Sequence, residues 1–135
     1  MRLISSVLFL TVLSCGAYSA QPDTAKSVST HDYVVLPKPE QLPSLRVQAM
    51  AGSPVAALQL ALWYMKFPQG IYNKEYWNHI AAENGSMVGQ YNFGLLLLSD
   101  KSDPLNKVRA RYWLTKAASQ GSELAKAQIA LLNKQ

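Results

Sequence analysis

Side chains that could carry out acid–base or metal chemistry are few in this chain and widely spaced. The two histidines, His31 and His79, have no second ligand at a metal-binding interval such as His-x3-His. The eight acidic residues include no close pair suited to general acid–base catalysis. An enzyme would have to combine His79 with a nearby carboxylate. We therefore expect no catalytic residue, no metal and no cofactor, and we interpret His79 as a residue on a helix surface.

The basic residues gather toward the C-terminus. The whole chain has a net charge of +5, and residues 101–135 alone contain seven basic and two acidic residues, so the rest is nearly neutral. Lys107, Arg109 and Arg111 are candidates for contacting an acidic protein surface or anionic lipid head groups. A solvated basic face that aids solubility explains the same residues equally well.

The elements that would position a site are encoded by a pattern of eleven residues that occurs three times. It begins at Gly52, Gly85 and Gly121, which are 33 and 36 residues apart. A second block, Tyr-Trp-x3-Ala-Ala-x2-Gly, occurs at residues 76–85 and again at residues 112–121. Periods of this size are typical of stacked helical hairpins.

Each repeat also contains signals for a helix, for the point where this helix crosses a neighbouring one, and for the turn. Small and apolar residues lie three, four or seven apart, which places them on one stripe of a helix. Ala or Gly at positions 56, 61, 89, 94, 125 and 130 leaves room where two helices cross. The three glycines suit a left-handed helix end, and the serine after each can cap the next helix. We predict helices at about 43–51, 54–66, 73–84, 87–98, 106–120 and 122–134, with the run Leu95–Leu98 buried centrally.

The repeats resemble a known family, the Sel-like repeats, which are α/α hairpins related to the tetratricopeptide repeat. The resemblance covers roughly residues 44 to 135. It implies an all-α fold, a short α/α-hairpin solenoid of about two and a half repeats spanning residues 43–135. Because members of the family mostly bind other proteins, it also implies a protein-binding function. The residues that carry it are Leu60-Ala61, Phe93-Gly94, Ile129-Ala130, Gly70-Ile71 and the two Tyr-Trp blocks.

The resemblance also implies a concave face lined by the first helix of each hairpin. Gln59, Trp63, Asn92 and Leu96 would lie on this face. Trp63 has Leu96 and Leu132 at its position in the other units, so it is a candidate interface anchor. Burial of Trp63 in the core is the alternative.

The N-terminal residues predict export. Arg2 is followed by the apolar run Leu3–Leu13, which fits a secretory signal and is too short to span a bilayer. Cys15 stands where the similar signals of bacterial lipoproteins carry the cysteine that becomes lipidated, and a competing cleavage site follows Ser19 or Ala20. We assign residues 1–20 to a signal peptide and residues 21–42 to a flexible tether rich in Pro, Ser and Thr.

These expectations combine into a hypothesis about function. The chain is expected to be a periplasmic protein anchored to the outer membrane through a lipid on Cys15, with a soluble periplasmic or secreted form as the alternative. Its partner would be another protein, and export disfavours nucleic acid. Small exported Sel-like proteins include immunity proteins, so the sharpest hypothesis is an immunity protein that occludes a toxic effector. An adaptor in envelope assembly and a structural lipoprotein are the alternatives.

Overall fold

A computed structural model describes residues 35–66 and 71–134 of the chain. The chain divides into two units, Met1–Asp32 and Tyr33–Gln135, and every described residue belongs to the second. The predicted signal peptide, Cys15 and most of the predicted tether lie outside the described residues.

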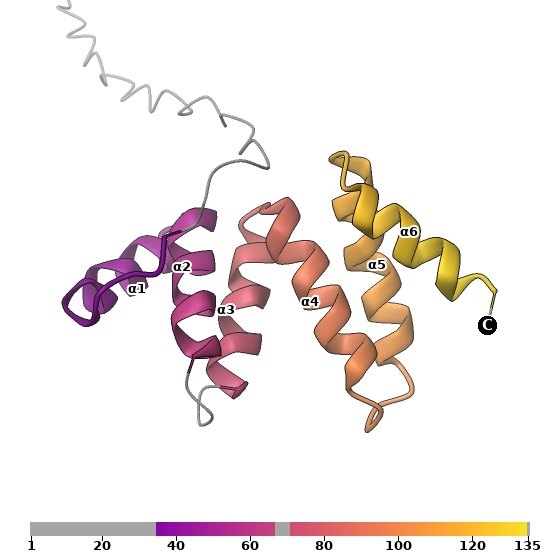
Figure 1. Cartoon of the computed structure of the whole chain (residues 1–135), viewed down its shortest axis with the longest axis horizontal. Helices are drawn as coiled ribbons and strands as arrows, with labels where there is room; N and C mark the ends of the chain where they lie inside the picture. Colours follow the sequence, from indigo (N-terminus) through magenta and orange to yellow (C-terminus); the bar gives the residue numbers. More distant parts are fainter. Residues whose placement is uncertain (1–34, 67–70, 135) are drawn as a thin grey trace, which may run out of the picture. The chain divides into compact units, whose positions relative to one another are not determined.

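Six α-helices follow one another in the described part of the chain, which contains no strand (Figure 1). Each helix packs against the next one in the sequence. This arrangement confirms the predicted all-α solenoid, and the ends of the helices agree with the prediction to within two residues. The elements are a 3-10 turn (Pro39–Gln41), α1 (Leu42–Met50), α2 (Pro54–Met65), α3 (Ile71–Glu83), α4 (Met87–Ser99), α5 (Asn106–Ser119) and α6 (Glu123–Leu132).

The three Gly-Ser turns have the same geometry. Gly52, Gly85 and Gly121 have φ angles of +102°, +86° and +99°, a left-handed region that side chains with a Cβ rarely adopt. In the second turn, for example, the Gly85 amide donates to the Ala82 carbonyl at 3.1 Å and the Ser86 amide donates to the Ala81 carbonyl at 2.9 Å. This pair of hydrogen bonds satisfies the last carbonyls of the preceding helix and confirms the predicted turn.

Each serine after these glycines begins the next helix. The Oγ atoms of Ser53, Ser86 and Ser122 accept a hydrogen bond from the backbone N–H three residues later, at 3.2, 3.0 and 3.2 Å. Such caps satisfy donors that have no partner within the helix. The predicted caps are therefore present at α2, α4 and α6.

Two glycines in α4 allow it to approach both of its neighbours. A Cβ atom at Gly89 would lie 2.7 Å from the Ala81 Cβ atom of α3, and a Cβ atom at Gly94 would lie 2.9 Å from the Leu114 Cγ atom of α5. Both distances are too short for carbon atoms in contact. Gly89 and Gly94 therefore mark helix crossings, and Ala56, Ala61 and Ala125 are buried as predicted, whereas Ala130 is exposed, contrary to the prediction.

The core is a series of three clusters along the array. The first joins α1, α2 and α3, the second joins α3, α4 and α5, and the third joins α5 and α6 with side chains of α4. The run Leu95–Leu98 is only partly buried, contrary to the prediction of central burial. Leu97 belongs to the core, whereas the other three leucines are half-buried, because the neighbours of α4 leave part of its circumference open.

Candidate binding site

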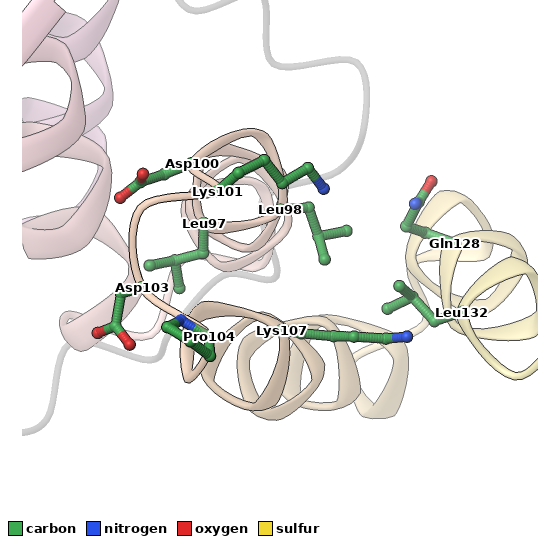
Figure 2. Close-up of a pocket in the computed structure, with 9 residues that line it drawn as sticks. All are labelled: Leu97, Leu98, Asp100, Lys101, Asp103, Pro104, Lys107, Gln128 and Leu132. Carbon is green, nitrogen blue, oxygen red and sulfur yellow. The ribbon is translucent and has the colours of Figure 1, made fainter. Parts of the chain in front are cut away.

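A cavity of about 290 Å³ lies where the C-terminal ends of α4 and α6 meet the start of α5 (Figure 2). Leucine side chains form its apolar part, and two lysines and a glutamine add polar groups. The residues that line it are Leu97, Leu98, Asp100, Lys101, Asp103, Pro104, Lys107, Gln128 and Leu132.

Three helices position these side chains. Leu98 lies in the last turn of α4, packs against two of the core clusters and is half-buried. Leu132 ends α6 and is buried in the third cluster, and Gln128 lies one turn before it. Lys107 lies in the first turn of α5. The cavity is thus a consequence of how α4, α5 and α6 pack.

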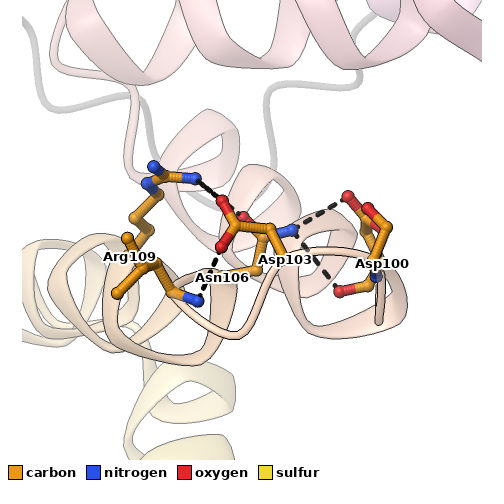
Figure 3. A network of polar contacts seen from close by, with 6 residues as sticks. Asp100, Asp103, Asn106 and Arg109 are labelled. Atoms are coloured by element: carbon orange, nitrogen blue, oxygen red, sulfur yellow. Dashed lines mark hydrogen bonds and ion pairs between the residues drawn. The ribbon is translucent and has the colours of Figure 1, made fainter.

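The loop between α4 and α5 is held by a polar network around Asn106 (Figure 3). Asn106 is buried, and its Nδ2 atom donates to the Asp100 Oδ2 atom at 2.8 Å and to the Asp100 carbonyl at 3.4 Å. Arg109 donates to the Asp103 Oδ2 atom at 2.6 Å and to the Asn106 Oδ1 atom at 3.1 Å. This network, in which each buried side-chain polar atom has a partner, fixes a turn that contains no glycine.

The two aspartates of this loop are stabilised as carboxylates. Hydrogen bonds from the Ser102 side chain and backbone, with a further one from Asn106, lower the pKa of Asp100 below its usual value of 3.8. The Leu105 backbone N–H and then the Arg109 guanidinium lower the pKa of Asp103 in the same direction. Both groups are therefore ionised at neutral pH, and their oxygens are occupied by the loop itself.

The three predicted basic residues have separate environments. Lys107 lines the cavity. Arg109 is engaged with Asp103 and Asn106, and Arg111 donates to the Asn133 Oδ1 atom at 2.5 Å. The structure therefore brings only Lys107 to the candidate site, while the two arginines hold the fold together.

The predicted concave-face residues do not line the cavity, although their repeat equivalents do. Gln59, Trp63, Asn92 and Leu96 are half-buried. Gln59 donates to the Val35 carbonyl at 3.5 Å, and Asn92 donates to the Asn78 Oδ1 atom at 3.3 Å. The lining residues at the same repeat positions are Gln128 and Leu132.

Sequence reasoning missed Lys101, Gln128 and Leu132 as site residues. The register of the repeats was a sufficient signal for two of them, because Gln128 corresponds to Gln59 and Asn92, and Leu132 corresponds to Trp63 and Leu96. No signal of this kind exists for Lys101, since the residue at its repeat position between α2 and α3 is Pro68.

His79 has a packing role in the structure. Its ring stacks on Phe93 with 4.4 Å between ring centroids and meets the edge of Trp113 at 5.9 Å. Its Nε2 atom lies 3.3 Å from the Glu83 Oε1 atom, one turn away on the same helix. These contacts join α3, α4 and α5 through aromatic rings. Among the described residues, no group of His, Cys, Asp or Glu side chains could hold a metal ion.

Comparison with protein-family models, with curated proteins and with solved structures finds no match to this chain. The helices of the described region are all too short or too polar to cross a membrane. The described part of the chain is an array of α/α hairpins with a cavity bordered by three of its helices.

Proposed function

We propose that this chain is an exported Sel-like repeat protein of the bacterial cell envelope that works by binding another protein. The observation that carries the proposal is the cavity bordered by α4, α5 and α6, which combines leucines, two lysines, two aspartates and an amide from these helices and the α4–α5 loop. Rigid repeat scaffolds commonly use such surfaces for partners rather than for catalysis. The catalytic alternative has only the His79–Glu83 pair, whose histidine ring stacks on Phe93 and packs edge-on against Trp113.

Within this class, we propose an immunity protein that occludes a toxic effector delivered to the periplasm. A lipid anchor on Cys15 would hold it at the outer membrane, where such an effector arrives. The support is the resemblance of the repeats and of the N-terminal residues to small exported Sel-like proteins. An adaptor in envelope assembly and a structural lipoprotein remain the competing proposals.

The test is affinity capture from the native envelope. The chain, produced with its own N-terminal segment and purified from the cell envelope, is immobilised, and the retained proteins are identified by mass spectrometry. Stoichiometric retention of a toxic enzyme supports the immunity protein. Retention of secretion or polysaccharide assembly proteins supports the adaptor, and retention of nothing contradicts a dedicated protein partner.

The processing of Cys15 is tested separately. Metabolic labelling with a fatty acid should label the native chain and leave a Cys15→Ser variant unlabelled. A labelled Cys15→Ser variant, or an unlabelled native chain with cleavage after residue 19 or 20, contradicts the lipid anchor.

A further inference from the structure

We propose that the α4–α6 cavity binds an extended acidic segment of the partner protein, in which an Asp or Glu side chain lies next to a branched apolar side chain. This inference rests on the proposed protein-binding function and specifies the chemistry of one contact. The charge, the apolar surface and the size of the cavity fit such a segment.

The cavity is lined by two lysines and two aspartates, and Arg109 pairs with Asp103, so these five charged side chains carry a net charge of +1. Lys101 and Lys107 are exposed, and within the described part of the chain neither forms an ion pair. Figure 2 shows both side chains extending toward α6, whereas Asp100 and Asp103 lie on the opposite side. The oxygens of those aspartates are occupied by the α4–α5 loop. A carboxylate entering between α4 and α6 would therefore meet the lysines first.

The interior of the cavity is apolar. Leu98 and Leu132 point into the space between α4 and α6 (Figure 2). Its volume of about 290 Å³ lies at the lower end of the range for ligand pockets, so it suits one or two side chains rather than a whole cofactor. The amide of Gln128 can both donate to and accept from a peptide backbone. Together these groups match a short peptide with one apolar and one acidic side chain.

A membrane surface matches these features less well. Anionic lipids attract clusters of basic residues on a surface, and they need no apolar hollow beside the charges. Here Arg109 and Arg111, the nearest arginines in the sequence, have partners within the chain. Lys101 and Lys107, which form no ion pair within the described residues, border a recess, and this favours a peptide segment over lipid head groups.

A peptide array tests the chemistry directly. The probes are pentapeptides with blocked ends, in which the three central positions run through all standard amino acids, and the chain is applied with a fluorescent label at low salt. We expect binding to concentrate on peptides with Asp or Glu beside Leu, Ile or Val. We expect a Lys107→Glu substitution to reduce that binding about tenfold or more, because it replaces attraction by repulsion.

The matched control is Lys66→Glu, which makes the same charge change at an exposed lysine that caps α2 away from the cavity. It should leave peptide binding unchanged. Lys107→Glu should still fold, since an acidic residue in the first turn of a helix interacts favourably with the helix dipole. Equal far-ultraviolet circular dichroism spectra of the two variants would establish this.

Four results would overturn the inference. They are selection of neutral or basic peptides, equal losses in both variants, no binding to any peptide of the array, and Lys107-dependent binding to phosphatidylglycerol vesicles. Envelope capture separates this inference from the proposed function. If Lys107→Glu retains the same partner as the native chain, the acidic-segment inference fails and protein binding stands. If neither retains a partner, the proposed function fails.

Discussion

At the scale of single residues, the position of Gly89 sets the distance between α3 and α4. The missing side chain at Gly89 faces backbone atoms of α3, because a Cβ atom there would lie 2.9 Å from both the Ala81 carbonyl carbon and the Ala82 nitrogen. At Gly94 the nearest atoms belong to the Leu114 side chain instead. Backbone atoms can move only if the whole helix moves.

A Gly89→Ala substitution should therefore destabilise the protein, even though alanine favours helix formation. We expect a loss of about 1–3 kcal/mol in the free energy of unfolding, as for other overpacked cores. Gly94→Ala should cost less, because the side chain of Leu114 can adjust. Urea unfolding followed by circular dichroism measures both. Equal or reversed losses would show that the α3–α4 crossing is not limited by Gly89.

The cost of a side chain at a glycine with positive φ can be measured at Gly121. Nothing lies within 4 Å of a Cβ atom built at Gly121, so only its φ of +99° opposes a side chain. Gly121→Ala should cost about 1 kcal/mol, which lowers the melting temperature by about 4–8 °C in a domain of this size. Gly121→Asn should cost less, since asparagine tolerates this conformation. Identical melting temperatures for the two variants would contradict this account of the turn.

At the scale of elements, the α4–α5 loop depends on its two carboxylates being ionised. The pKa values of Asp100 and Asp103 are lowered in the folded protein. Their contribution to stability is therefore fully present above the ordinary pKa of 3.8, and it is lost as the pH falls through the lower, folded values.

A doubly substituted variant, Asp100→Asn with Asp103→Asn, isolates this effect. We expect it to be less stable than the native chain at pH of about 6, and we expect the difference to shrink as the pH falls below the usual aspartate value. Melting temperatures across this range provide the measurement. The two chains share all other acidic residues. If their melting temperatures change with pH in parallel, the ionisation of Asp100 and Asp103 does not contribute to the pH dependence of stability.

The sequence predicted the elements well, because their signals are local. Each Gly-Ser pair determines a helix end and the next helix start through bonds that span at most five residues. Asp103-Pro104 predicted a surface turn between α4 and α5, but not its geometry, because the order of this loop comes from the side chains of Asp100, Asn106 and Arg109 rather than from glycine. Composition alone indicated only that the loop is polar.

The candidate site was predicted less well, for a related reason. Lys107 was chosen for its charge, and it does line the cavity. The sequence could not separate it from Arg109 and Arg111, because their partners, Asp103 and Asn133, are selected by the packing of α5 against its loop and against α6. The direction of the Lys101 side chain likewise depends on where the α4–α5 loop places it.

At the scale of the described array, polar side chains link successive units. The Asn84 Nδ2 atom donates to the Ala49 carbonyl at 2.9 Å, and the Gln120 Nε2 atom donates to the Gln90 Oε1 atom at 2.7 Å. Asn84 and Gln120 occupy the same repeat position, directly before the glycine of the turn. An amide at this position therefore ties the end of one helix to an earlier helix of the array in both units.

A substitution of Gln120 tests this link. Gln90 is buried, so Gln120→Ala would leave its Oε1 atom without that donor, at a cost of about 1–3 kcal/mol. Ser119→Ala, at a neighbouring exposed position, is the control and should cost less. Chemical unfolding compares the two, and a negligible effect of Gln120→Ala would mean that water replaces the lost donor.

The position of α6 as the last described helix has a consequence for the stability of the cavity. Among the described helices, α6 packs chiefly against α5, and an element with few packed neighbours opens more readily than one packed on both sides. Because α6 supplies Leu132 and Gln128, the cavity exists only while this last helix is docked. An occupant that contacts Leu132 and Gln128 would therefore stabilise the docked state of α6, slowing amide hydrogen exchange in α6 while leaving that of α2 unchanged.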